Sequence, residues 1–365
     1  MSPSNTFLFC GGGSGGHLFP ALAVVEELRQ RFADNCHIQF LTTGRDIEHQ
    51  ILSEGAVEQI SLGTVSSTTL LKTPLRSIAR LLSSIRQARE ILRESKPRVV
   101  IGLGGFGSVP GIWAAKSLGL PIVLLEQNAI AGRANSWLSR WADLVCISFP
   151  DTGRLKCRRT VLTGNPIRRS ILQAVSQRQE RSRKLLILGG SQGAEALNTA
   201  MISILGALKA ALHDWEIVHQ TGSSDVDRVS AAYQSHGMSA DVRSFIADIA
   251  PVLASSELVI SRAGATTLAE LAVMGLPAIL VPIPNSVRNH QYLNAERLEQ
   301  AGAAFIVEQD SDTTSFHVHL ESGLTKLIAD SGRRQQMQAS MLELAQPAAV
   351  ERVVHEVLNL ADLKS

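Results

Sequence analysis

The residues with the clearest chemical potential lie in a glycine-rich loop near the start of the chain. Residues 11–17 are GGGSGGH, and they follow an apolar run and open a helical pattern. Glycine accepts positive φ angles and leaves room for a substrate to approach the main chain closely. His17 stands in the first turn of the expected helix, where an imidazole can accept a proton near neutral pH. It is therefore a candidate general base, with a helix-start histidine that only satisfies backbone groups as the alternative.

This loop matches two familiar nucleotide-binding patterns only in part. It satisfies G-x-G-x-x-G, but a dinucleotide site also needs an acidic residue at the end of the second strand. That strand is expected to end at Thr42, Thr43 and Gly44, without an acid. A P-loop needs lysine after its last glycine, where this chain has His17. Both an NAD-dependent dehydrogenase and a P-loop enzyme are therefore disfavoured.

Two further loops in the second half of the chain have the composition of phosphate sites. Residues 189–194 are GGSQGA, and residues 261–267 are SRAGATT and lead into a helix that contains Glu270. Free N–H groups and the positive end of the helix dipole bind anions at such a helix start, most naturally a diphosphate. Glu270 could accept hydrogen bonds from ribose hydroxyls or simply compensate the helix dipole, and the spacing leaves both options open.

The elements that must position these loops alternate along the chain. Short apolar runs alternate with amphipathic stretches, which is typical of parallel sheets with helices on both faces. The fold class is therefore α/β, and the strand–glycine–helix architecture occurs twice. The expected strands are 6–10, 37–43, 98–105, 121–127 and 143–149, followed by 184–190, 215–221, 257–264 and 277–283.

The two series are separated at residues 163–168, TGNPIR, where glycine and Asn-Pro interrupt both periodicities. At about 150 residues per domain, the length also favours two domains. We expect an N-terminal domain at 1–163 and a second domain at 164–345. The remaining stretch, 346–365, is expected to be a helix, for which packing back on the first domain is one option.

Composition and charge disfavour several classes of protein. The 365 residues carry 35 Lys and Arg against 33 Asp and Glu, a net charge of +2, and 4% of them are aromatic. A nucleic-acid-binding protein needs cations for phosphates and aromatic side chains for bases. The N-terminal segment lacks the basic start of a signal peptide, and no segment has the roughly eighteen apolar residues of a membrane-spanning helix. Any action at a membrane is expected to be at its surface.

The cysteines show no spacing that holds zinc or an iron–sulfur cluster, and we expect reduced thiols. Two of them fall in apolar runs and are expected to be buried as small hydrophobic residues. His317 and His319 could be imagined as a metal pair, but without cysteine or carboxylate partners they are expected to be surface residues. The four cysteines are Cys10, Cys36, Cys146 and Cys157.

Seven motifs in register resemble those of the peptidoglycan N-acetylglucosaminyltransferases of glycosyltransferase family 28. Each motif is weak alone, but their order and spacing hold from about residue 7 to residue 310. They are GGGSGGH at 11–17, GLGGFGSVPG at 102–111, LLEQNAIAGRANSWL at 124–138, TGNPIR at 163–168, GGSQGA at 189–194, SRAGATTLAE at 261–270 and NHQYLNAERLEQAGAA at 289–304.

The resemblance implies a GT-B fold, with two Rossmann-like domains whose parallel sheets face a deep cleft. The first domain would bind the acceptor and the second UDP-N-acetylglucosamine (UDP-GlcNAc). The implied reaction transfers GlcNAc to the C4 hydroxyl of MurNAc in undecaprenyl-diphospho-MurNAc-pentapeptide (lipid I), giving lipid II for the bacterial cell wall. Because the donor is α-linked and the product β-1,4-linked, the reaction inverts configuration. It needs a general base and no covalent sugar intermediate.

The resemblance also implies roles for individual residues. His17 is the candidate base or an acceptor-site residue, and Glu126 is a second candidate that could orient or deprotonate a hydroxyl. Glu270 would hold the ribose, Ile246 the uracil through its main chain, and Arg168 would face the nucleotide. The remaining donor contacts would come from Ser14, Gly15, Gly16, Asn128, Ser191, Gln192, Gly264, Ala265, Thr266 and Gln291, with Asn128 and Gln291 on the GlcNAc hydroxyls. Acceptor contacts would come from Gly13, Gly104, Gly105 and Ser108.

Two further expectations concern chemistry that the chain should lack. A leaving UDP can be stabilised by helix N-termini, and the chain has no DxD motif, so we expect no metal ion and no cofactor. Relatives often carry tyrosine where this chain has Phe106. Any hydroxyl contact made at that position is therefore absent here.

The stretch from Pro74 to Glu94 is the candidate membrane contact. Its helical pattern places apolar residues along one side with arginines close by, as in a basic amphipathic helix on an anionic bilayer. We expect a peripheral protein on the cytoplasmic face of the cell membrane, with a helix packed on the first sheet as the alternative. The apolar residues are Leu75, Ile78, Leu82 and Ile85, and the arginines are Arg76, Arg80, Arg86, Arg89 and Arg93.

Two other functions remain as alternatives. A UDP-GlcNAc 2-epimerase would share the fold and the donor but would produce UDP-ManNAc without an acceptor. A regulatory protein that binds a UDP-sugar without catalysis would keep the phosphate loops and would need neither His17 nor an acceptor site.

Overall fold

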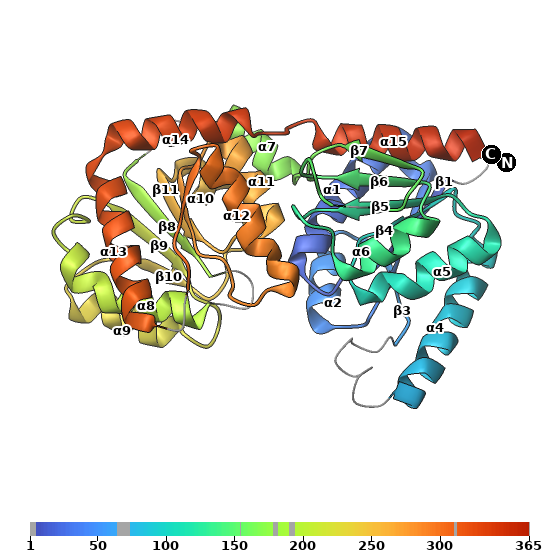
Figure 1. The fold of residues 1–365 in the computed structure, drawn as a ribbon, viewed down its shortest axis with the longest axis horizontal. Helices are drawn as coiled ribbons and strands as arrows, with labels where there is room; N and C mark the ends of the chain where they lie inside the picture. Colours follow the sequence, from blue (N-terminus) through green and yellow to red (C-terminus); the bar gives the residue numbers. More distant parts are fainter. Residues whose placement is uncertain are drawn as a thin grey trace. The chain divides into compact units, whose positions relative to one another are not determined.

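The computed structural model describes residues 5–63, 74–153, 155–177, 182–189, 194–309 and 312–364 (Figure 1). The chain divides into two compact units. Unit 1 contains Met1–Arg168 and Pro347–Ser365, and unit 2 contains Arg169–Gln346. The sequence places a domain boundary after residue 163, on the segment that precedes this division.

Unit 1 is built on a parallel sheet of seven strands in the order β3-β2-β1-β4-β5-β6-β7. Because every neighbouring pair is parallel, all strands end at the same edge of the sheet, and the loops that follow them gather there. The strands are β1 (Asn5–Cys10), β2 (Cys36–Thr42), β3 (Glu58–Ser61), β4 (Val99–Gly102), β5 (Ile122–Glu126), β6 (Leu144–Ile147) and β7 (Arg159–Leu162).

Successive residues of β1 point to opposite faces of this sheet, and each face has its own apolar core. Phe7 and Phe9 belong to one core, together with residues of α1 (Gly15–Phe32), α2 (Asp46–Glu54) and α15 (Ala349–Lys364). Leu8 and Cys10 belong to the other, with residues of α4 (Pro74–Ser95), α5 (Val109–Leu118) and α6 (Arg133–Leu138). Cys10 and Cys146 are buried free thiols, as their apolar surroundings predict.

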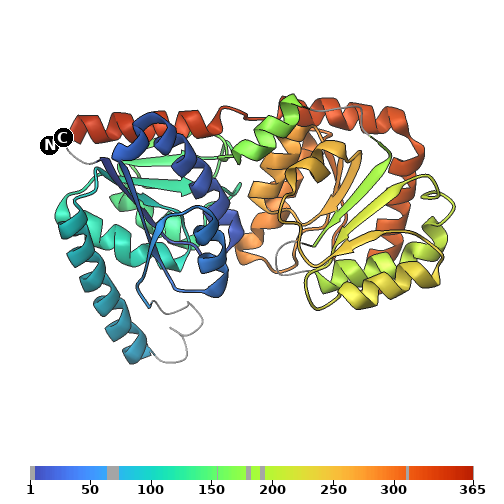
Figure 2. The same ribbon diagram turned by 180° about the vertical axis from the view of Figure 1, so that it is seen from behind.

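The last helix, α15, belongs to unit 1 although it follows unit 2 in the sequence. Val353, Val354 and Val357 are fully buried in the core that also contains Phe7 and Phe9. Arg159 on β7 pairs with Glu356, and α15 lies beside α1 (Figures 1 and 2). The chain therefore returns to unit 1 to complete its core.

Unit 2 repeats the design with a parallel sheet of six strands in the order β10-β9-β8-β11-β12-β13. The strands are β8 (Lys184–Leu188), β9 (Glu216–Gln220), β10 (Asp241–Arg243), β11 (Leu258–Ser261), β12 (Ala278–Leu280) and β13 (Ala304–Ile306). The helices are α7 (Arg169–Ser176), α8 (Glu195–Leu208), α9 (Val226–Ser235), α10 (Ala250–Ser255), α11 (Ala265–Met274), α12 (His290–Gln300), α13 (Thr313–Ala329) and α14 (Ser331–Glu343).

The α/β class and the two parallel-sheet, Rossmann-like units predicted from the sequence are confirmed. Each of the nine expected apolar runs contains a strand. The structure adds β3, β7, β10 and β13, which are the two edge strands of each sheet. Their side chains are largely exposed or half-buried, so these strands lack the continuous apolar pattern by which the others are predicted.

Candidate active site

The glycine loop of unit 1 connects β1 to α1. Gly11, Gly12 and Gly13 have φ angles of 113°, 150° and 90°, which L-residues with side chains rarely adopt. A Cβ atom at Gly11 would lie 2.7 Å from the carbonyl oxygen of Gly104, in the loop after β4. The first glycines therefore allow two loops at the carboxyl edge of the sheet to pack backbone against backbone.

His17 lies half-buried in the first turn of α1, at the same edge of the sheet. Its main-chain N–H donates to the carbonyl of Ser14, the N-cap residue of the helix. Its Nδ1 atom is 3.1 Å from Oε1 of Gln127, which directly follows β5 and is 2% exposed. A Cβ atom at Gly104 would lie 3.3 Å from His17 Cε1. The structure thus brings His17 together with Gly104, a predicted acceptor residue.

Glu126, the second candidate base, is the last residue of β5 and is 2% exposed. Its Oε1 accepts from the main-chain N–H and the side-chain amide of Asn128 at 3.0 and 3.2 Å. Its Oε2 accepts from Gly132 N and Asn135 Nδ2, both at 2.9 Å. Four donors thus hold the carboxylate, and the loop from Gln127 to the start of α6 is fixed around it.

The remaining predicted acceptor residues form the turn after β4. Gly104 and Gly105 have φ angles of 93° and 69°. The hydroxyl of Ser108 is buried and donates to Gly105 O at 2.8 Å, so it closes this turn from inside. Phe106 is half-buried between them.

Gly13, the other predicted acceptor residue, lies in the glycine loop after β1. Its carbonyl oxygen accepts a long hydrogen bond of 3.4 Å from Arg45.

Three predicted donor contacts lie around the start of α1. Ser14 and Gly16 are exposed, while Gly15 is buried, with a would-be Cβ atom only 2.8 Å from the ring of Phe19. Arg168, at the end of the predicted linker, places its guanidinium 4.6 Å from the centre of the same Phe19 ring. The ring therefore supports both the helix start and the cation.

In unit 2, helix α11 begins directly after the loop that follows β11. Gly264 is its N-cap residue, and Ala265 and Thr266 supply the first helical N–H groups. Glu270 lies one turn further on and is 6% exposed. Asn294 Nδ2 on α12 donates to Ala263 O at 3.1 Å and so ties the loop to the neighbouring helix. Burial lowers the pKa of Arg262, which precedes this loop, to about 10, so it remains a cation at neutral pH.

Amide side chains form the hydrogen bonds at the predicted contacts for uracil, Ile246, and for the sugar, Gln291. Ile246 N donates to Oε1 of Gln220, at the end of β9, at 3.0 Å. Gln291, in the first turn of α12, accepts from Ile283 N at 3.0 Å. Ser191 and Gln192 lie outside the described residues.

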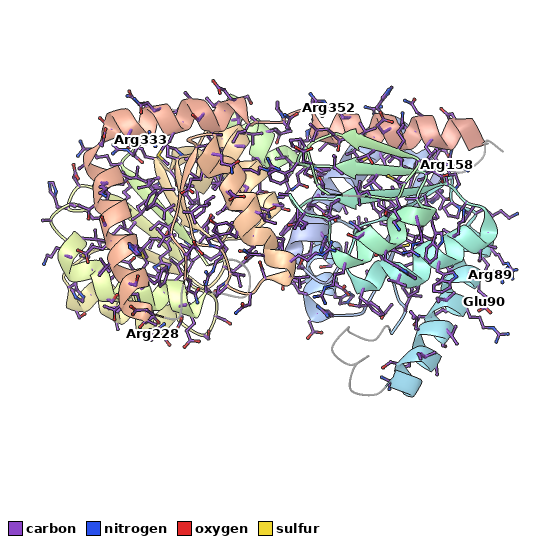
Figure 3. The ribbon with its side chains drawn as sticks, in the orientation of Figure 1. Arg89, Glu90, Arg158, Arg228, Arg333 and Arg352 are labelled. Atoms are coloured by element: carbon purple, nitrogen blue, oxygen red, sulfur yellow. The ribbon has the colours of Figure 1, made fainter. Side chains whose placement is uncertain are left out.

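Behind these loops, unit 2 contains a buried polar network centred on His219. Asn198 Nδ2 donates to Thr221 O and to Asp225, so Asn198 Oδ1 must accept from His219 Nε2 at 3.1 Å. His219 Nδ1 then accepts from the hydroxyl of Tyr233. Burial lowers the pKa of His219 to about 3, so its ring is neutral at ordinary pH. Arg228 on α9, labelled in Figure 3, closes the network by pairing with Asp225.

The histidine pair on α13 that could be imagined as a metal site does not form a metal centre. His317 Nδ1 hydrogen-bonds with Ser203 Oγ at 2.9 Å, and His319 is exposed. Within the described ranges, no three metal-ligating side chains lie close enough to hold an ion.

The structure adds four polar residues that sequence reasoning missed: Gln127, Asn135, Gln220 and Asn294. Each is buried and hydrogen-bonds a predicted site residue or its loop. Gln127 and Gln220 end apolar runs, and Gln127, Asn135 and Asn294 lie inside the quoted motifs. Amides that end or closely follow a buried strand are the signal that could have identified the two glutamines.

Two family models match the chain. The glycosyltransferase family 28 N-terminal domain matches residues 7–147, and the glycosyltransferase family 28 C-terminal domain matches residues 184–353. The first match contains His17 and Glu126, and the second contains Glu270 and Gln291. Both candidate sites therefore lie in matched segments.

Two curated relatives are similar along nearly their whole length. Each is named UDP-N-acetylglucosamine--N-acetylmuramyl-(pentapeptide) pyrophosphoryl-undecaprenol N-acetylglucosamine transferase. The protein from Geobacter sulfurreducens is 38% identical over 360 residues, which cover 96% of this chain and 97% of the relative. The protein from Azotobacter vinelandii is 38% identical over 361 residues, which cover 97% and 98%.

Solved structures agree in fold. The crystal structure of Acinetobacter baumannii MurG superposes with a TM-score of 0.77 at 32% identity, covering 97% of this chain and 99% of that one. UDP-GlcNAc 2-epimerase from Neisseria meningitidis superposes with a TM-score of 0.66, but at 14% identity, over 97% of this chain and all of its own. At this identity, the similarity to the epimerase shows a shared fold and nothing more.

Proposed function

The chain belongs to glycosyltransferase family 28, and from that premise we propose its reaction: transfer of GlcNAc from UDP-GlcNAc to N-acetylmuramyl-(pentapeptide) pyrophosphoryl-undecaprenol, lipid I. It is an N-acetylglucosaminyltransferase of peptidoglycan synthesis. The observation that carries this conclusion is the extent of the similarity, 38% identity over 96% of the chain. Because both units are matched, the similarity includes the acceptor-binding and donor-binding halves.

In the acceptor half, His17 acts as the general base. The C4 oxygen of MurNAc attacks C1 of the donor sugar, the bond from C1 to the diphosphate oxygen breaks, and UDP leaves with the electron pair. The attack comes from the face opposite the leaving diphosphate and so inverts the configuration at C1 without a covalent intermediate, while His17 takes the hydroxyl proton. Support comes from its place in the first turn of α1, beside the positive-φ loop residue Gly104.

Glu126 acts as a positioning residue in this scheme. Its two oxygens accept from four donors within its own loop. Because both oxygens are already used to hold the loop, we assign Glu126 to positioning and the proton transfer to His17. Through the loop it orients Gln127 and Asn128, the second of which is a proposed contact for the GlcNAc hydroxyls.

In the donor half, helix α11 stabilises the negative charge that develops on the leaving UDP. The main-chain N–H groups at the start of this helix, at Ala265 and Thr266, and the positive end of the helix dipole would bind the diphosphate. Ser191 and Gln192, which lie outside the described residues, are proposed as further diphosphate contacts. Glu270 holds the ribose hydroxyls, and Ile246 presents its main chain to the uracil. This arrangement needs no divalent cation, so we propose metal-independent transfer.

The lipid-linked acceptor places the reaction at a membrane surface, and α4 is the proposed contact. Ile78 and Leu82 on this helix are 49% and 61% exposed, while Ser84, Ala88 and Leu92 face the interior. Arg80, Arg86 and Arg93 are exposed, as is Glu90, labelled in Figure 3. The side chains of Leu75 and Arg76 lie outside the described residues. An amphipathic helix of this kind binds an anionic bilayer as a peripheral element.

One further feature of unit 1 supports the same surface. Trp113 on α5, the helix that packs against α4, is 40% exposed. A pocket of about 280 Å³ elsewhere in unit 1 is lined by four basic residues and by Asp143, which pairs with Arg158, labelled in Figure 3. The four basic residues are Lys116, Arg140, Lys156 and Arg158. In the part of the chain that the structure describes, no helix is both long and apolar enough to cross a bilayer.

The proposed function is tested by transfer of labelled GlcNAc from UDP-GlcNAc to a short-chain lipid I analogue in EDTA. We expect glycosylated acceptor with the parent protein, a lower kcat for His17→Ala and a higher donor KM for Glu270→Ala. Formation of UDP-ManNAc without acceptor product would favour an epimerase instead. Donor binding without any turnover would favour a regulatory protein.

A further inference from the structure

We propose that Gln127 is a positioning residue that determines which ring nitrogen of His17 carries the proton. Gln127 Oε1 lies 3.1 Å from His17 Nδ1. A carbonyl oxygen can only accept, so Nδ1 must donate, and a neutral ring then has its unprotonated nitrogen at Nε2. The role of His17 as base rests on the proposed function, whereas the hydrogen bond and its effect on the ring do not.

The backbone that carries the glutamine is held in place on both sides. It is 2% exposed, and it lies between Glu126, whose carboxylate accepts from four donors, and Asn128, which supplies two of them. The backbone on both sides of Gln127 is therefore fixed. On the other side of the pair, His17 is fixed by the first turn of α1 and by the hydrogen bond from its N–H to Ser14.

The amide has a property that a carboxylate at this position would lack. A carboxylate beside Nδ1 would favour the imidazolium and raise the pKa of the ring. The neutral amide orients the imidazole without that effect, and it leaves Nε2 as the nitrogen that can accept a proton. Gln127 thus orients the imidazole of His17 without adding a negative charge that would stabilise the imidazolium.

A second observation points toward a bound molecule. Gln127 Nε2 is buried and has no hydrogen-bond partner among the described residues, and the same holds for Oδ1 of Asn135. Asn135 lies beside His17, since a would-be Cβ atom at Gly104 is 3.2 Å from Asn135 Nδ2 and 3.3 Å from His17 Cε1. Buried polar atoms are rarely left unpaired. We infer that an oxygen of the acceptor or a water molecule accepts a hydrogen bond from Nε2 of Gln127.

The first test measures the tautomer directly and does not depend on transfer. ¹⁵N-histidine NMR of the whole protein identifies the His17 ring by its loss in His17→Ala. We expect Nδ1 to be protonated in the parent and the more common Nε2-protonated form to dominate in Gln127→Met. An Nε2-protonated ring in the parent, as a flipped amide would produce, or an unchanged ring in Gln127→Met would overturn the proposal.

The chain offers a matched control in the same unit. His49 Nδ1 lies 2.7 Å from Gln59 Oε1, but this pair is exposed on α2 and β3. Gln59→Met should leave kcat unchanged, whereas Gln127→Met should lower it by about ten- to a hundredfold with little change in donor KM.

Kinetics then connect the tautomer to catalysis. Gln127→Glu should move the acid limb of the kcat/KM profile upward by about one pH unit, because the new carboxylate favours the imidazolium. Adding Gln127→Met to His17→Ala should lower kcat by no more than about twofold, since the two residues act as one unit. A fully additive loss or an unmoved acid limb would contradict the proposal. If the tautomer changes as expected but the parent transfers no GlcNAc, the positioning role stands and the proposed function fails.

Discussion

Asn135 donates from Nδ2 to the carboxylate of Glu126 and to the carbonyl of Leu125, both at 2.9 Å, and so fastens α6 to the end of β5. One amide side chain thereby links β5 to α6 across the loop that joins them. The geometry of everything between them, Gln127 and Asn128 included, depends on this link.

Replacing Glu126 should therefore destabilise unit 1 as well as reduce activity. In Glu126→Gln, one of the two oxygens becomes an NH₂ group that faces N–H donors, and the free energy of unfolding should fall by about 1–3 kcal/mol. Urea unfolding measures this change. An unaltered unfolding free energy combined with a large loss of kcat would instead identify Glu126 as the base.

A methyl group at residue 104, in the turn after β4, should disturb His17. Gly104→Ala places a Cβ atom 3.3 Å from His17 Cε1 at a backbone φ of +93°, so kcat should fall by about tenfold or more. Gly119→Ala is the matched control, because its φ is +71° and no atom lies within 4 Å of the new carbon. Equal losses in the two variants would show that backbone strain alone is responsible.

Membrane binding should depend on the two exposed apolar residues of α4. Ile78→Glu combined with Leu82→Glu removes apolar area and adds negative charge, so less protein should sediment with vesicles that contain anionic lipid. UDP-GlcNAc binding should be unchanged. Val318→Glu on α13 serves as the control, since Val318 is 57% exposed in unit 2. Unchanged sedimentation of the α4 variant would exclude this helix as the contact.

The buried His219 should make unit 2 less stable in mild acid. The unfolded chain binds a proton below the ordinary pKa of 6.5, whereas the folded protein binds it only near pH 3. Stability due to this residue is thus fully present above pH 6.5 and is lost as the pH falls, by about 1.4 kcal/mol per pH unit. Between pH 6.5 and 5 the parent should lose about 2 kcal/mol more than His219→Gln.

This change can be followed in unit 2 alone. Trp215 belongs to unit 2, and the other three tryptophans, Trp113, Trp137 and Trp141, belong to unit 1. With those three replaced by phenylalanine, the fluorescence of Trp215 reports urea unfolding of unit 2 at each pH. Parallel pH dependence in the parent and His219→Gln would contradict the prediction.

The sequence predicts the central strands of both sheets because burial on both faces requires continuous apolar runs. The edge strands escape prediction for the same reason: β7, for example, is mostly exposed, and its pairing with β6 depends on backbone hydrogen bonds that any residue can make. Hydrophobic patterning carries information about burial and none about strand pairing at an edge.

The candidate site shows a similar division. His17 and Glu270 are identified by their place at helix starts after glycine loops, which is a local property of the sequence. The partnership of His17 with Gln127 joins residues 110 positions apart, and only the packing of α1 against the end of β5 creates it. The same holds for Glu126. Its residue type suggests a general base, whereas its four hydrogen bonds indicate that it holds the loop between β5 and α6 in place.

The return of α15 to unit 1 has a consequence for how the protein is made. Arg98 donates to Asn5 at the first residue of β1 and to Asp362 near the end of α15, so one side chain joins segments from opposite ends of the chain. On the ribosome, unit 2 is synthesised in full before α15 emerges. The valines that complete the Phe7 core arrive last, and until then the nascent first unit presents an open apolar face that chaperones would be expected to shield.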